Sequence, residues 1–140
     1  MKSKTVKIIL VIGGLLIISQ LIPVDHSNPP VVAKIKVPEQ VETIFKRSCN
    51  DCHSNETIWP WYSNVAPVSW LVAHDVEEGR EHLNFSTWGT LPENKQQKLR
   101  KEIWETISED EMPPLVYLPA HPDARLNDID KLDIRNWLGA

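Results

Sequence analysis

The sequence is poor in cysteine: only two occur among 140 residues, and both lie in one pentapeptide, Cys49-Asn50-Asp51-Cys52-His53. A disulfide framework is therefore excluded, and a bridge between these two cysteines would close a loop too short to stabilise the fold. A second Cys-x-x-Cys or His-x-x-x-His type pair is also missing, so a structural zinc site would lack two ligands. No strand-helix-strand pattern surrounds the pair, which removes the usual setting of a thioredoxin-like redox site.

The chain also lacks an excess of basic residues. It has 15 lysines and arginines against 19 acidic residues, for a net charge of −4. Three of the basic residues, Lys2, Lys4 and Lys7, precede every acidic residue, so the remainder is more acidic still. Such a surface repels phosphate backbones, which excludes nucleic acid as a partner and favours basic or neutral proteins.

What the pentapeptide does contain is Cys-x-x-Cys-His, the attachment signal for c-type haem. Residues three and four apart share one face of a helix, so Cys49, Cys52 and His53 can address one flat group together. We predict one covalent haem c, with thioether bonds from the two thiols to its vinyl groups. His53 would be the proximal ligand of its iron.

A second iron ligand is predicted at Met112, the only methionine besides the initiator. A thioether is a known sixth ligand of haem iron, and the two prolines after Met112 would stiffen the loop that presents the sulfur. A lone methionine also serves as a gap filler in cores. The rival ligands are His74, His82 and His121.

The N-terminus is basic over residues 1–7 and then uncharged from Ile8 to Val24. This pattern is typical of an export signal or a membrane anchor. Because no small-x-small cleavage site follows, we expect residues 1–24 to be an uncleaved signal anchor that binds the membrane. The lysines would stay inside, which places the haem domain on the extracytoplasmic side of a bacterial inner membrane, in the periplasm. Residues 25–37, with Pro29-Pro30, are expected to be a linker.

Residues 38–140 are expected to form one all-α domain around the haem. Apolar residues recur at helical spacing after Pro38 and again over 91–107. A short helix is expected to end near Gly79, and Asn127 or Asp128 can cap a final helix. The aromatic residues between Ser54 and Trp88 could wall a porphyrin face or form ordinary core.

These motifs resemble class I cytochromes c, and more closely the haem-binding domain family of small, membrane-anchored bacterial c-type cytochromes. The resemblance covers about residues 38–138. Its matching residues are Cys49, Cys52, His53, Pro60-Trp61-Tyr62, Gly79-Arg80, Leu83-Asn84-Phe85-Ser86, Trp88, Met112-Pro113, His121-Pro122, Ala124 and Leu126. It implies a helical cytochrome c fold, a covalent haem, and His53 with Met112 as axial ligands. Gly79, Arg80, Asn84 and Ser86 could serve a propionate or a partner surface, or be turn residues.

A haem with both axial positions filled has no open site, so we expect one-electron transfer between redox protein partners rather than enzymatic activity. If Met112 does not bind, an open iron position would instead suit a peroxidase-like enzyme or a gas or redox sensor. A third possibility is an interaction module whose tryptophan-rich segment engages a partner.

Overall fold

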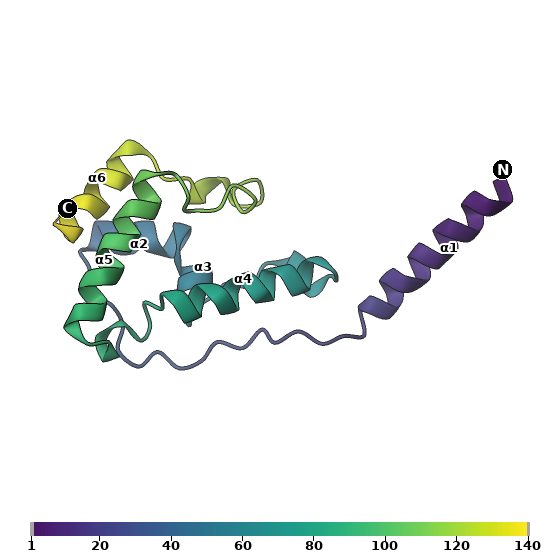
Figure 1. The fold of residues 1–140 in the computed structure, drawn as a ribbon, viewed down its shortest axis with the longest axis horizontal. Coiled ribbons are helices and arrows are strands. Elements are labelled where there is room, and N and C mark those ends of the chain that lie inside the picture. Colours follow the sequence, from purple (N-terminus) through teal and green to yellow (C-terminus); the bar gives the residue numbers. More distant parts are fainter. Residues whose placement is uncertain (1, 140) are drawn as a thin grey trace.

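The structure, a computed structural model, describes residues 2–139, and all regular structure in that range is helical. Residue 1 of the expected anchor and residue 140 of the expected domain lie outside the described residues. The α-helices are α1 Lys2–Ser19, α2 Glu39–Ser48, α3 Asn50–His53, α4 Val68–His82, α5 Glu93–Ser108 and α6 Asp128–Leu138. Three 3-10 turns lie between them: η1 Trp61–Asn64, η2 Trp88–Thr90 and η3 Pro122–Ala124. In Figure 1, α2, α3, α5 and α6 gather at one end of the molecule, while α1 stands apart at the other.

The prediction of a membrane-anchor helix over residues 1–24 is wrong. Between residues 2 and 139, no helix is both long enough and apolar enough to cross a membrane. α1 includes Lys4 and Lys7, and it ends at Ser19, before the apolar run does. Its uncharged part, Ile8–Ser19, rises only about 18 Å at 1.5 Å per residue. A bilayer core is about 30 Å thick.

The segment between α1 and α2 is extended and lies along the helical domain (Figure 1). Its backbone is hydrogen-bonded to the connection that follows α4: Ile35 N–H donates to Phe85 O at 2.8 Å and Ala33 N–H to Ser86 O at 3.0 Å. Near α1, the Gln20 amide pairs with both backbone groups of Ala66, each at 3.0 Å. The segment 25–37 is therefore fixed to the domain along part of its length.

The core lies where α2, α5 and α6 meet. The helix expected after Pro38 is α2, and its predicted apolar face, Val41, Ile44 and Phe45, is buried. Phe45 is central to this core, because its ring stacks on Phe85 at 4.6 Å and meets the edge of Trp137 at 5.6 Å. The helix expected over 91–107 is α5, and it buries the predicted residues Leu99, Ile103 and Ile107.

α6 begins at one of the two predicted caps, Asn127, and the cap also joins α6 to α2. The Asn127 side chain accepts the N–H groups of Ile129 and Asp130, and the Asp130 carboxylate accepts the N–H of Asn127 in return. The same carboxylate lies 2.5 Å from the Arg47 guanidinium of α2. Burial works to raise the pKa of Asp130, but the bonds from Arg47 and Asn127 outweigh it and lower that pKa. Asp130 thus ties the capped start of α6 to α2.

Candidate functional site

The pentapeptide forms the junction between α2 and α3. Cys49 ends α2 and precedes α3, a single turn that carries Cys52 and His53. The carbonyl of Cys49 accepts the N–H of His53 at 2.9 Å, which closes that turn. Both thiols are free, and Cys49 lines a cavity together with His53. Cys52 is not among the residues that line this cavity, because its Cβ faces the backbone of α4 at Gly79.

The two thiols are protonated at neutral pH. Burial raises the pKa of the Cys49 thiol to about 12, and burial with the nearby Asp51 carboxylate raises that of Cys52 to about 11. A thioredoxin-like pair works through a thiolate, which requires the opposite shift in pKa. The structure therefore disfavours the redox-pair interpretation of the motif.

His53 has one ring nitrogen committed and one available. Its Nδ1 lies 3.0 Å from the carbonyl oxygen of Gly79 and 3.1 Å from that of Leu83, both at the end of α4. Carbonyls only accept, so Nδ1 carries the hydrogen and Nε2 keeps its lone pair. Burial lowers the pKa of His53, which keeps the imidazole neutral. A neutral imidazole whose Nδ1–H is held by a carbonyl is the usual arrangement for a metal ligand.

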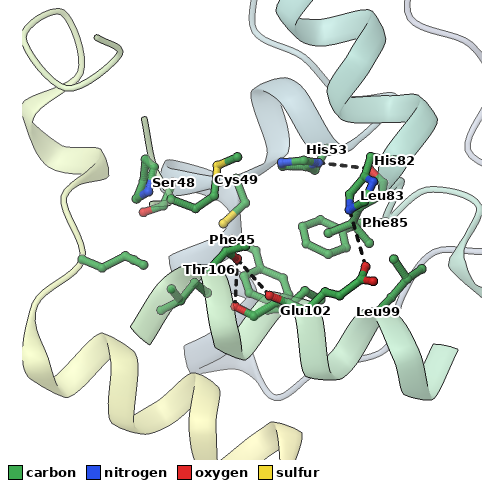
Figure 2. Close-up of a pocket in the computed structure, with 15 residues that line it drawn as sticks. Phe45, Ser48, Cys49, His53, His82, Leu83, Phe85, Leu99, Glu102 and Thr106 are labelled. Atoms are coloured by element: carbon green, nitrogen blue, oxygen red, sulfur yellow. Dashed lines mark hydrogen bonds and ion pairs between the residues drawn. The ribbon is translucent and has the colours of Figure 1, made fainter. Parts of the chain in front are cut away.

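The cavity beside His53 is mostly apolar and lies between the motif and α5. Figure 2 shows His53 and Cys49 on one side of it and Glu102 and Thr106 of α5 on the other. Its apolar lining includes Phe45, Leu83, Phe85, Leu99, Ile103, Ile107 and Leu126. One buried polar atom in the lining, Ser48 Oγ, has no hydrogen-bond partner in the described part of the chain. An apolar slot with a free imidazole nitrogen and an orphaned hydroxyl fits a porphyrin, which has a flat apolar body and polar edges.

Met112 lines the same cavity as His53, and its residue is 39% exposed. The end of α5 holds its backbone, since Thr106 O accepts the N–H groups of Glu111 and Met112 at 2.9 and 3.3 Å. The next residue, Pro113, is buried and also lines the cavity. The structure therefore brings together three of the four predicted site residues, Cys49, His53 and Met112, around one space.

Of the rival histidines, only His82 lines the cavity. It lies beside Leu83 in Figure 2, and its Nε2 is 3.5 Å from the Glu102 carboxylate. His74 lies 3.5 Å from Glu78 one turn along α4, away from the cavity, and His121 stacks on Tyr117. Met112 and His82 are therefore the two predicted sixth-ligand candidates that line the cavity, and His82 lies beside the Glu102 carboxylate.

Arg80, Asn84 and Ser86 hold neighbouring segments together rather than line the cavity. The Arg80 guanidinium donates to Ser54 O at 2.8 Å and to Thr57 Oγ1 at 2.8 Å, which fixes the chain just after the motif. It also reaches Ser27 O and Asn28 Oδ1 of the extended segment. Asn84 donates to Asn55 Oδ1, and the hydroxyl of Ser86 accepts the Asn55 N–H. Through these bonds, the three residues hold the segment that directly follows the motif, on the side away from the cavity.

Gly79 is a site residue whose role the sequence did not reveal. α4 runs three residues past it to His82, so Gly79 does not end the helix as expected. A Cβ at this position would lie 2.6 Å from Cys52 O and 3.0 Å from Cys52 Cβ. The missing side chain therefore lets α4 touch the motif backbone and brings the Gly79 carbonyl to His53. A glycine inside a helical pattern is the signal that points to such close packing.

We expect Gly79→Ala to damage the site specifically. The added methyl must push α4 away from α3, because its nearest neighbour is backbone, at a cost of about 1–3 kcal/mol. The hydrogen bonds from His53 Nδ1 would lengthen, so haem incorporation should fall along with the urea midpoint of unfolding. Gly89→Ala is the matched control, since its Cβ would meet the Ala33 side chain at 3.0 Å, away from the motif. Normal haem content in Gly79→Ala would contradict this role.

A family model described as a haem-binding domain matches residues 14–140. No curated protein and no solved structure matches the chain. The family model spans most of the sequence, including the pentapeptide, the cavity and Met112. The chain therefore belongs to the haem-binding domain family, and its domain binds haem.

Proposed function

We propose that this protein is a mono-haem c-type cytochrome that transfers single electrons, with haem bound covalently at Cys49 and Cys52. One observation carries the proposal. The neutral imidazole of His53 in α3 and the thioether of Met112 in the loop after α5 both line the apolar cavity that Cys49 also lines. Histidine with methionine is the ligand pair of cytochromes c, and it raises the reduction potential.

Covalent attachment would use both thiols without an oxidant or a reductant. Each sulfur would form a bond to one carbon of a vinyl group, and the thiol hydrogen would go to the other carbon as the double bond becomes single. The protonated state of Cys49 and Cys52 supplies that hydrogen. Since His53 follows Cys52 directly, the same turn that holds the ring presents its Nε2 to the iron.

When bound, the haem supplies an iron that cycles between its ferric and ferrous states, taking an electron from one redox protein and passing it to another. His53 and Met112 would bind the iron, and the apolar residues that line the cavity would limit its contact with water. The chain then offers no open coordination site, which is why we propose a carrier rather than an enzyme. We place it on the extracytoplasmic side of a bacterial cell, because a basic start followed by a short apolar run is typical of export.

The test is spectroscopy of the purified, oxidised protein. Absorption and magnetic spectra should show low-spin iron with a sulfur-to-iron signature, and acidic organic solvent should leave the haem on the denatured polypeptide. High-spin iron would contradict the filled sixth position and with it the carrier function. A low-spin spectrum without the sulfur signature would instead point to a histidine ligand, for which His82 is the cavity-lining candidate.

A further inference from the structure

The loop that carries Met112, residues 109–127, contains no α-helix. It consists of hydrogen-bonded turns around Tyr117, in which His121 N–H donates to Tyr117 O at 3.2 Å, followed by the short turn η3. On the N-terminal side of Met112, the loop is held by Thr106 O at the end of α5. The position of the Met112 side chain therefore depends on what fixes the loop on the other side.

The attachment on that side that lies nearer to Met112 in the sequence is Tyr117; further along the loop, the Arg47 guanidinium of α2 donates to Asp123 O at 2.9 Å. Its hydroxyl donates to Asp51 Oδ2 at 2.8 Å, and Asp51 lies between the two cysteines of the motif. Asp51 is itself fixed, because its Oδ1 accepts the N–H of Ile58 at 2.9 Å and its carbonyl accepts the hydroxyl of Thr57 at 2.7 Å. The loop that carries Met112 is thus bonded to the same helical turn that carries His53.

Two further residues, His121 and Tyr62, support the ring of Tyr117. Its ring stacks on His121 with centroids 4.0 Å apart and planes 6° from parallel. His121 Nε2 lies 2.6 Å from the hydroxyl of Tyr62, which belongs to η1. Burial and the Asp51 carboxylate raise the pKa of Tyr117, so its hydroxyl stays a donor. The loop is therefore held at α3 and at η1 together.

We propose that Tyr117 is a positioning residue: its hydrogen bond to Asp51 holds the Met112 loop against the haem motif and so keeps Met112 on the iron. This inference rests on the proposed ligand pair. A small external ligand that replaces Met112 must compete with the closed loop, so every bond present only in the closed loop opposes it. Loss of one hydrogen bond to a charged acceptor should raise the apparent affinity for the external ligand by about tenfold.

The experiment is Tyr117→Phe, which removes the hydroxyl and keeps the ring on His121. Imidazole titration of the oxidised holoprotein should show about tenfold tighter apparent binding than in the unmutated protein. Hydrogen exchange should rise at the amides of Tyr117 and His121. Thr57→Val is the matched control, because it removes a hydroxyl that is bonded to the Asp51 carbonyl and to Arg80, neither of which belongs to the Met112 loop. This control should leave imidazole binding unchanged.

The outcomes separate this inference from the proposed function. If the unmutated protein shows the sulfur signature and Tyr117→Phe binds imidazole no better, the positioning role is overturned while the carrier function stands. If Thr57→Val bound imidazole as tightly as Tyr117→Phe, the positioning role would also be overturned, because the gain in affinity would then come from a general loosening of the motif. If the unmutated protein lacks the sulfur signature, the ligand pair is wrong, and the role of Tyr117 at the iron is overturned with it.

Discussion

Replacing both cysteines, Cys49→Ser with Cys52→Ser, is expected to abolish covalent haem attachment. The thioethers are the proposed covalent links, and a serine hydroxyl in place of each thiol leaves the porphyrin held only by His53, Met112 and the apolar lining. Haem would then pass into acidic organic solvent when the protein is denatured. The folded protein should also lose stability, because the proposed haem would fill the space between the motif and α5 and thereby complete a small core.

The single variants make this test sharper. Cys49 faces the cavity while Cys52 lies against Gly79, so the two positions are not equivalent in the structure. Either single variant keeps one thiol and should retain haem on the denatured chain, in lower yield. Retention of haem by the double variant after extraction would contradict thioether attachment.

The sequence predicts most of the helices, because their signals are local. Apolar spacing places α2 and α5 correctly, and the polar residues before Ile129 locate the start of α6. The motif also predicts His53 as an iron ligand without knowledge of the fold. These features depend on residues within one or two turns of each other, which is the range over which periodicity and capping act.

Features that depend on distant parts of the chain do not emerge from the sequence. His53 is oriented by the carbonyls of Gly79 and Leu83, and the Met112 loop is held by Asp51; these partners are 26 residues or more from the groups they fix. The anchor prediction is wrong for a related reason, since hydropathy over residues 8–24 does not show that α1 ends at Ser19. Tertiary packing determines how the site residues are oriented, and the position of a helix end determines the length of α1.

The structure also changes how the aromatic segment is understood. Tyr62 was one of many residues that could have faced a porphyrin, yet its hydroxyl lies against His121 in the loop. Trp61, its neighbour, is 80% exposed and does not line the cavity. The segment therefore serves partly to close the Met112 loop, and Trp61 is left at the surface.

If the proposed ligand pair is right, Met112→Ala is expected to convert the proposed electron carrier into a protein that binds external ligands. Loss of the thioether opens the sixth position, so the oxidised iron should become high-spin, its sulfur signature should vanish and its reduction potential should fall. Apparent affinity for imidazole should rise by about tenfold to a thousandfold, since an open state populated at about 0.1–10% becomes the main one. Absorption titration measures this directly.

The matched control is Met112→Leu, which keeps an apolar side chain of similar size but has no sulfur donor. If ligation by Met112 is what closes the site, Leu and Ala should behave alike in spin state and both should bind imidazole more tightly. His82→Ala should leave the sulfur signature intact, because His82 lies beside Glu102. If Met112→Leu kept low-spin iron and the affinity of the unmutated protein, another residue would fill the sixth position.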